Sequence, residues 1–279
     1  MVNPHRAPVK DAIVGSLWEI VHKVWTWRRL VKALAVRDFR VRYAGSMLGA
    51  AWAILEPAVH FSLYLVVFEL LLGTRLASGD GVGPFGLYLL SGLVPFLAFQ
   101  ETLTRAVGLA PEHANLIRHV AVPVEALVFG SLLAVLLRQG VALAVVLAAC
   151  AAWGSISLVN VPLAVIGLML LVLGAWGVAL LLVPVGAYLP DAAHGVGVGC
   201  TVLFFLTPIV YRQGVVPGAM QPIFAVNPLV GALELIRAGL LGGRVAPFHV
   251  VVTAVAALAF ASGGAWAFRR RVVDLRDVV

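Results

Sequence analysis

Apolar residues form long blocks along this chain, and charged residues fall almost entirely between the blocks. Between Arg138 and Asp191, 52 consecutive positions hold no Asp, Glu, Lys or Arg. A helix that crosses a membrane needs about 20 predominantly apolar residues, so this stretch is long enough for two. The same pattern over the whole chain predicts six membrane-spanning helices, at about residues 47–73, 85–105, 125–152, 161–188, 195–211 and 247–268.

The composition agrees with this pattern. Of the 279 residues, 62% are hydrophobic and 12% are charged, and the mean hydropathy is +1.02. Soluble domains have about 45–50% apolar and about 25% charged residues, so we expect an all-α polytopic membrane protein. It is predicted to be a single transmembrane domain over residues 1–279, made of an N-terminal tail (1–46), a six-span bundle (47–268) and a C-terminal tail (269–279).

The charges indicate the orientation of the chain. The net charge is +7, and nine of the twenty Lys and Arg residues lie within residues 1–46, with four more in the last eleven. Positive residues beside apolar spans mark the cytoplasmic side, so we predict a cytoplasmic (inner) membrane protein with both termini in the cytoplasm and no nucleic-acid partner. Arg212, Arg237 and Arg244 fit this orientation less well, because they fall in a segment predicted to face outward. Cys150 and Cys200 have no spacing typical of a metal site or a disulfide, and no bound metal is expected.

Residues 27–36 have the pattern of an amphipathic helix that lies along the membrane surface. Trp27, Leu30, Val31 and Leu34 share one face, and basic residues share the other. The pattern breaks at Arg37, which predicts a kink or turn there. Six basic residues are predicted to contact lipid headgroups: Arg28, Arg29, Lys32, Arg37, Arg40 and Arg42.

A second helix that does not cross the membrane is predicted between the fifth and sixth spans. Asn227 followed by Pro228 is a helix start, and Gly242–Gly243 is a helix end. The enclosed helix has about 14 residues and is too short to cross a membrane. With the apolar segment 215–220 before it, it is interpreted as one of two short re-entrant or interfacial pieces, the alternative being a helix that lies on the membrane surface.

Few ionisable residues fall inside the predicted spans. Glu56 precedes Pro57, and His60 lies one helical turn further on as a possible partner. Arg138 allows two interpretations, a guanidinium that extends to the inner surface or one that faces a polar path. Glu69 and Glu101 are placed near span ends.

Three groups of residues resemble the permeases of polysaccharide-exporting ABC transporters, a family that exports O-antigen, teichoic acid, capsule and galactan. The first is the run RDFRVRY at 37–43 with GSMLG at 45–49, Trp52 and Glu56-Pro57. The second is NLIR at 115–118 with Val122-Pro123. The third is FLTPIVY at 205–211 with NPL at 227–229 and Arg237. The resemblance extends from about residue 30 to the C-terminus, and Arg138 matches none of its motifs, so no role is carried over to it.

The resemblance implies a homodimer that pairs with two copies of a separate ATPase chain and moves a lipid-linked polysaccharide through a channel between the two permeases. This chain lacks the phosphate-binding pattern Gly-x-x-x-x-Gly-Lys-Ser/Thr, and the glycines at 81, 83 and 86 are interpreted as a turn. No cofactor is therefore expected in this chain, and ATP and Mg²⁺ are expected on the partner ATPase. In the family, the loop after the second span contacts the ATPase, which implies a coupling role for Glu112, Asn115 and Arg118. The alternative is an ordinary solvated connector.

Aromatic rings stack on sugar rings, so we expect them along a glycan path. Phe61, Tyr64 and Phe68 recur on one helical face, although such a stripe is also typical of packing or lipid contact. The residues predicted to line the channel are Trp52, Glu56, Phe61, Tyr64, Phe68, Phe204, Phe205 and Tyr211. The family has re-entrant elements at the outer mouth of the channel, which implies an outer gate formed by Asn227, Pro228, Glu234 and Arg237.

Three other functions were weighed. An ABC exporter of a drug, lipid or peptide would have the same architecture. An ion-coupled secondary transporter would need paired acidic residues at the middle of the membrane and an internal repeat, and the sequence shows neither. An intramembrane serine protease would need a serine and histidine arrangement, which is also absent from the sequence.

Overall fold

The computed structural model describes residues 19, 22–67, 85–114, 124–154, 159–211 and 216–272, and within them every regular element is helical. This confirms the all-α prediction. The elements in chain order are α2 (Arg28–Tyr43), η1 (Gly49–Ala51), α3 (Trp52–Leu65), α4 (Phe85–Glu112), α6 (Val124–Ala152), α7 (Val161–Tyr188), α8 (Ala192–Phe205), α9 (Gln221–Ala225), α10 (Pro228–Leu241) and α11 (Pro247–Arg271).

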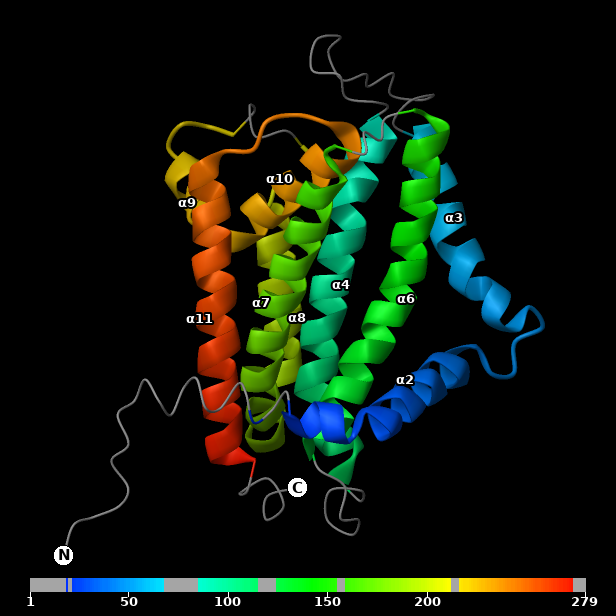
Figure 1. Ribbon diagram of the computed structural model, residues 1–279, viewed down its shortest axis with the longest axis vertical. Coiled ribbons are helices and arrows are strands. Elements are labelled where there is room, and N and C mark those ends of the chain that lie inside the picture. Colours follow the sequence, from blue (N-terminus) through cyan, green and yellow to red (C-terminus); the bar gives the residue numbers. More distant parts are fainter. Residues whose placement is uncertain are drawn as a thin grey trace, which may run out of the picture.

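Four helices are long and apolar enough to cross a membrane: α4, α6, α7 and α11. They stand roughly parallel in one bundle (Figure 1). The predicted bounds of the fourth span are those of α7, and the predicted third span differs from α6 by one residue. α3 and α8, at the first and fifth predicted spans, have only 14 helical residues each, and the first predicted span continues beyond the described residues. The described helices therefore include four candidate spans, and the count of six stays a prediction.

The fifth predicted span, 195–211, is only partly helical. α8 ends at Phe205, three residues before Pro208. Proline restricts the residue before it, so a helix ends at or before that position. The backbone from 206 to 211 then continues without helical structure, although Thr207, Pro208 and Ile209 are buried. Because non-helical backbone at membrane depth needs internal partners, these carbonyl groups require side-chain donors.

Small residues allow several helices to approach closely. Gly177 of α7 lies against the backbone of Phe260 and Ala261 of α11, and Gly264 of α11 lies against the backbone of Gly177. A Cβ atom at Gly177 or Gly264 would collide with that backbone, which cannot rotate away as a side chain can. Small residues at such crossings are typical of membrane helix packing, so α7 and α11 form one tightly packed unit.

The amphipathic helix α2 is longer than predicted and does not kink at Arg37. It continues as regular helix to Tyr43, and the chain turns at Gly45, whose φ is +82°. The kink was predicted from the break in the amphipathic pattern at Arg37. That prediction was wrong because the residues that break the pattern, Asp38 and Arg42, form ion pairs with α4 and so fit a continuing helix. Val31 and Ala35 are buried, and α2 packs along α6.

The short helix α10 lies inside the bundle near one end of it (Figure 1). Its N-cap is Asn227, whose side chain accepts a hydrogen bond from the Leu229 N–H at 3.0 Å, and Gly242 follows its last residue with φ +78°. Twelve of its 14 residues are buried, among α4, α7 and α11. The predicted start, end and length are confirmed, and this burial favours the re-entrant interpretation over a helix that lies on the surface.

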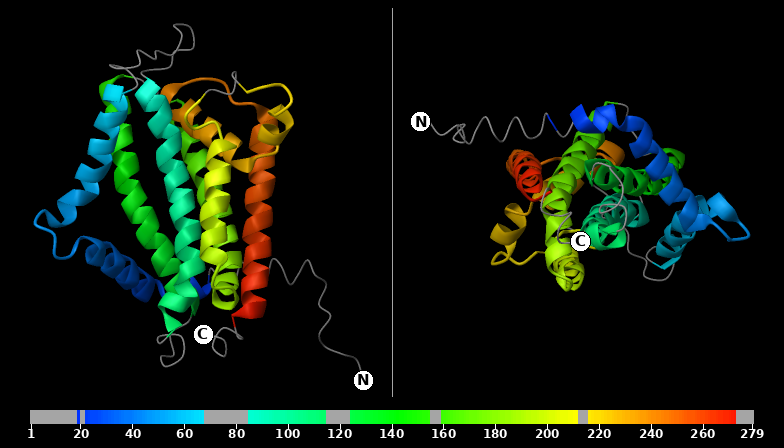
Figure 2. Two further views of the ribbon diagram at one scale, coloured as in Figure 1. Left: turned by 180° about the vertical axis from the view of Figure 1, so that it is seen from behind. Right: turned by 90° about the horizontal axis from the view of Figure 1, so that it is seen from below.

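Several connections meet at the opposite end of the bundle. α2, the end of α4, the start of α6, the turn between α7 and α8 and the end of α11 all lie there (Figures 1 and 2). α2 and the C-terminal end of α11 thus lie at the same end of the bundle. The end that carries α2 is called the inner end below, and the end that carries α10 the outer end, after the orientation predicted from the charges.

Candidate functional site

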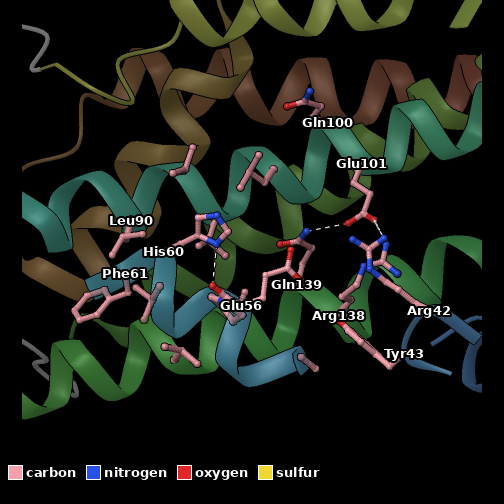
Figure 3. Close-up of a pocket in the computed structure, with 18 of the residues that line it drawn as sticks. Arg42, Tyr43, Glu56, His60, Phe61, Leu90, Gln100, Glu101, Arg138 and Gln139 are labelled. Carbon is pink, nitrogen blue, oxygen red and sulfur yellow. Dashed lines mark hydrogen bonds and ion pairs between the residues drawn. The ribbon is translucent and has the colours of Figure 1, made fainter. Parts of the chain in front are cut away.

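A cavity of about 440 Å³ lies between α3, α4 and α6. Figure 2 shows α3 leaning away from the other helices toward α2. Residues of α3 line the cavity on this side, facing residues of α4 and α6. Its polar lining residues come from four helices (Figure 3): Arg42, Tyr43, Glu56, His60, Gln100, Glu101, Thr104, Arg138 and Gln139. In a bundle of such apolar helices, this concentration of polar groups marks a candidate functional site.

Glu101 of α4 is the centre of the charged cluster in this cavity. Its carboxylate forms an ion pair with Arg138 Nη2 and accepts a hydrogen bond from Gln139 Nε2 at 2.9 Å. Arg42 Nη1 of α2 lies 3.9 Å from the same carboxylate. Glu101 therefore joins three helices through charge-assisted contacts.

The structure bears on both interpretations of Arg138. Its side chain is 7% exposed and held by Glu101, which favours a guanidinium that faces a polar space over one that extends to the inner surface. Glu101 lies inside α4, which continues to Glu112, past the predicted end of the span at 105. The pair itself was not predicted, because neither sequence position shows that its partner is 37 residues away.

The α3 residues predicted to line a channel fall into different environments. Glu56 and Phe61 line the cavity. The predicted partner of Glu56, His60, contacts its main-chain carbonyl at 2.8 Å through Nδ1 rather than its carboxylate. Trp52 is exposed on the helix surface. The side chain of Tyr64 and all of Phe68 lie outside the described residues.

The aromatic residues predicted on the fifth span gather near the end of α8. Phe204 packs edge-to-face on Phe96 of α4, with ring centroids 5.4 Å apart, while Phe205 is 62% exposed. The Tyr211 hydroxyl donates a hydrogen bond to the Phe205 carbonyl, and its ring lies 6.2 Å from that of Phe224. Phe204 is thus a packing residue, whereas Phe205 presents its ring to the surroundings.

Arg237 of α10 organises the outer end. It is 8% exposed and donates hydrogen bonds to the carbonyls of Pro208 at 2.7 Å and Ile209 at 3.1 Å. Its guanidinium carbon also lies 3.8 Å from the ring centroid of Tyr88, and it donates to the Tyr88 hydroxyl at 3.0 Å. Arg237 therefore supplies the donors that the non-helical backbone after α8 requires.

The other predicted gate residues surround this arrangement. The Asn227 amide donates to the Leu206 carbonyl and to the Thr207 hydroxyl, both at 3.0 Å. Pro228 is the first residue of α10, and its carbonyl accepts a hydrogen bond from Thr253 at 2.7 Å. Glu234 contacts His249 Nδ1 at 2.9 Å. The structure thus places Asn227 and Arg237 at the junction of α8, α10 and α4, whereas Pro228 and Glu234 contact α11.

Tyr88 and Thr207 are functional neighbours that the sequence interpretation missed. Tyr88 lies 149 residues before Arg237, and a tyrosine near the start of a span is normally assigned to the membrane interface. For Thr207 a signal was available, because Thr-Pro at the end of an apolar block indicates broken helix and exposed carbonyls.

At the inner end, Glu112 belongs to a chain of ion pairs. Arg105 of α4 lies 3.7 Å from Glu112 and 3.3 Å from Asp38 of α2. Glu112 also borders a cleft of about 530 Å³ between the end of α4 and the turn that joins α7 to α8. Asn115 and Arg118, the other predicted coupling residues, lie outside the described residues.

The six basic residues of α2 are exposed: Arg28, Arg29, Lys32, Arg37, Arg40 and Arg42. Contact with lipid headgroups stays a prediction for them. No group of three His, Cys, Asp or Glu side chains within the described ranges is arranged to hold a metal ion.

Comparison with known proteins identifies the family. The model of the family described as ABC-2 type transporter matches residues 29–241. The chain is 27% identical to the polysialic acid transport protein KpsM of Escherichia coli over 216 residues, which are 77% of this chain and 82% of KpsM. It is 23% identical to the O-antigen export system permease protein RfbA of Klebsiella pneumoniae over 208 residues (73% and 77%) and 22% identical to that of Myxococcus xanthus over 221 residues (78% and 83%). The chain therefore belongs to the ABC-2 type transporter family, as a multi-pass membrane subunit and not an ATPase.

Proposed function

We propose that this chain is the permease subunit of an ATP-driven exporter that moves a lipid-linked polysaccharide out across the cytoplasmic membrane. The observation that carries the proposal is the similarity, over about three quarters of the chain, to proteins named for polysialic acid transport and O-antigen export. The substrate follows from those names, and its binding is supported by the polar cavity beside α3.

The exporter is proposed to contain two copies of this chain with the channel between them. The outward surfaces of α3 and α8 support this arrangement. Exposed apolar side chains cover α3, and on α8 a Cβ atom at Gly195 or Gly199 would meet no described atom within 4 Å. Glycines four residues apart allow helices to approach closely, so α8 offers a surface for a second copy. Phe205, exposed on the same helix, then faces the channel or the partner copy.

ATP and Mg²⁺ are proposed to bind a separate ATPase chain, present in two copies, which docks at the inner end. The cleft bordered by Glu112 supports this position, because Glu112 and Ala114, which line it, come directly before Asn115 and Arg118 in the sequence. Both termini are proposed to lie on the same, cytoplasmic side. A force on this loop would reach α2 through Glu112, Arg105 and Asp38.

The outer gate is proposed to be the junction of α8 and α10. Arg237 and Asn227 fix the carbonyls of Leu206, Pro208 and Ile209, so a movement of α10 would move the end of α8 with it. Glycan would pass where these segments from two copies meet.

Depletion of the chain in its native host tests the proposal. If the chain exports glycan, polysaccharide should disappear from the cell surface while lipid-linked glycan accumulates on the inside. Complementation with the wild-type chain should restore export, and complementation with Arg118→Glu should not, because charge reversal would disrupt ATPase docking. Unchanged surface polysaccharide after depletion would contradict the substrate assignment. Copurification of the ATPase with the Arg118→Glu chain, together with full export, would contradict the coupling role alone.

A further inference from the structure

The cavity between α3, α4 and α6 has one end that carries excess positive charge. Two guanidinium groups, of Arg42 and Arg138, share the single carboxylate of Glu101. Glu56 also lines the cavity, beside His60 and Gln139 (Figure 3), but among the described residues it forms no ion pair with either arginine. At ion-pair distance, Arg42 and Arg138 therefore have one carboxylate for two positive charges.

Neighbouring acidic groups do not remove this excess. Asp38, on the same helix as Arg42, lies 3.3 Å from Arg105 and 3.8 Å from Arg37, so two other cations already share its charge. Tyr43 is neutral, and Gln139 uses its amide to donate to Glu101. An additional negative charge at this end would be stabilised by both arginines.

Arg138 also has unused hydrogen-bond donors. Its side chain is 7% exposed, and within the described part of the chain its Nε and Nη1 atoms have no acceptor. Buried donors without partners are costly, so this geometry favours an acceptor that is bound there. Arg42 lies directly beside Arg138 (Figure 3), and its half-exposed side chain can move to admit one.

The remainder of the cavity is apolar. Leu90, Leu93 and Leu97 of α4 face Val145 and Val146 of α6 along its wall. A small soluble anion would gain nothing from this wall, whereas a hydrocarbon chain would be removed from contact with water. The ligand that fits both parts is an amphiphile with an anionic head. A phosphate suits the head best, because its several oxygens can accept from two guanidinium groups at once.

We propose that this cavity binds the phosphate group of a membrane lipid, with the phosphate between Arg42 and Arg138 and the lipid chain along the leucine wall of α4. Two lipids carry this chemistry: a bulk anionic phospholipid, and the lipid anchor of the exported molecule. The second source rests on the proposed function.

Native mass spectrometry of the delipidated full chain tests the site with defined probes. Dioleoyl phosphatidic acid and dioleoyl phosphatidylglycerol should bind saturably, and dioleoylglycerol, which lacks phosphate, should not. Arg42→Gln should weaken phosphatidic acid binding at least about tenfold, because charged hydrogen bonds are lost while the pair between Arg138 and Glu101 stays intact. Arg42→Lys should bind with intermediate affinity, since it keeps the charge but not the planar donor group.

Arg244→Gln is the matched control, because Arg244 is exposed and lies far from the cavity, before α11. It should bind phosphatidic acid as the wild type does. Equal binding of dioleoylglycerol and phosphatidic acid, or equal losses in Arg42→Gln and Arg244→Gln, would overturn the proposal. Displacement of the lipid by an equal concentration of inorganic phosphate would also overturn it, because the apolar wall would then contribute nothing.

Export measurements separate the two lipid sources. If the ligand is the anchor of the exported molecule, Arg42→Gln should slow export, and extracted lipid-linked glycan should compete with phosphatidic acid. If it is a bulk phospholipid, Arg42→Gln should lose bound phospholipid while export continues at the wild-type rate. A chain that binds phosphatidic acid through Arg42 but exports no glycan would disprove the proposed function and leave the lipid site standing.

Discussion

The two sides of the helix bundle are held together by different means. On the side of α7, α10 and α11, glycine and alanine bring backbones into contact, and α10 is almost wholly enclosed. On the side of α2, α3, α4 and α6, the helices diverge around a cavity and are joined by ion pairs. Backbones in contact cannot separate without losing all of their packing, whereas ion pairs beside a cavity can exchange partners. We therefore expect transport movements to occur on the α3 side, with the α7–α11 side as a rigid support.

The largest effect is expected at the crossing of α7 and α11. Gly264→Leu would place a side chain into the backbone of Gly177. It should lower the free energy of unfolding by about 3 kcal/mol or more, enough to prevent recovery of folded protein. Gly263→Leu is a matched control, because a Cβ atom there would meet no described atom within 4 Å. Size-exclusion chromatography and thermal unfolding in detergent measure the folded state and the stability of both variants. Equal stability of the two variants would mean that α7 and α11 do not form a rigid unit.

A smaller but clear loss is expected when Arg237 is replaced by Met, which retains much of its length but no donors. The carbonyls of Pro208 and Ile209 would lose their hydrogen bonds, so the free energy of unfolding should fall by about 2–3 kcal/mol. Arg244→Met, an exposed position near the same end, should change stability by less than about 0.5 kcal/mol. Thermal unfolding of both variants in the same detergent measures the difference. Equal unfolding midpoints would show that the hydrogen bonds of Arg237 do not stabilise the structure.

The ends of α10 and α7 could be predicted from the sequence, because helix ends depend on residues that are close together in the chain. Asn227 with Pro228 and Gly242 gave the limits of α10, because a cap, a fixed φ and a positive φ act within one helical turn. The limits of α7 followed from an uninterrupted apolar block between Asn160 and Asp191.

The candidate site depends on contacts between helices, so only some of its residues could be predicted from the sequence. Single positions such as Glu56 and Phe61 were found because charge and aromatic periodicity are visible along one helix. The residues that surround them were not found, since the polar cluster forms only when α2, α4 and α6 pack together. The same reasoning explains the missed continuation of α2, because Asp38 and Arg42, which break its amphipathic pattern, have their ion-pair partners on α4.

The pair of Arg138 and Glu101 should show a moderate coupling. Replacing either residue with Gln leaves the other charge unpaired, while the double variant removes both charges. Because the Glu101 side chain is still 21% exposed to the cavity, we expect a coupling free energy of only about 1–2 kcal/mol. A double-mutant cycle of thermal stability measures it. Strict additivity would mean that the two side chains do not interact, and a much larger coupling would mean that this side of the bundle is as rigid as the α7–α11 side.

The smallest change in stability is expected where α2 is tied to α4 by Arg105. Its partners Asp38 and Glu112 are partly or largely solvent-exposed, so Arg105→Gln should cost less than about 1 kcal/mol, and high salt should reduce the difference. ATPase stimulation by the permease should nevertheless fall, because movement of the inner loop would no longer reach α2. Lys32→Gln, on the exposed side of α2, should affect neither measurement. If Arg105→Gln lowers stability as much as Arg237→Met does, the α2 contacts are part of the rigid support, and the proposed division between a mobile and a fixed side is wrong.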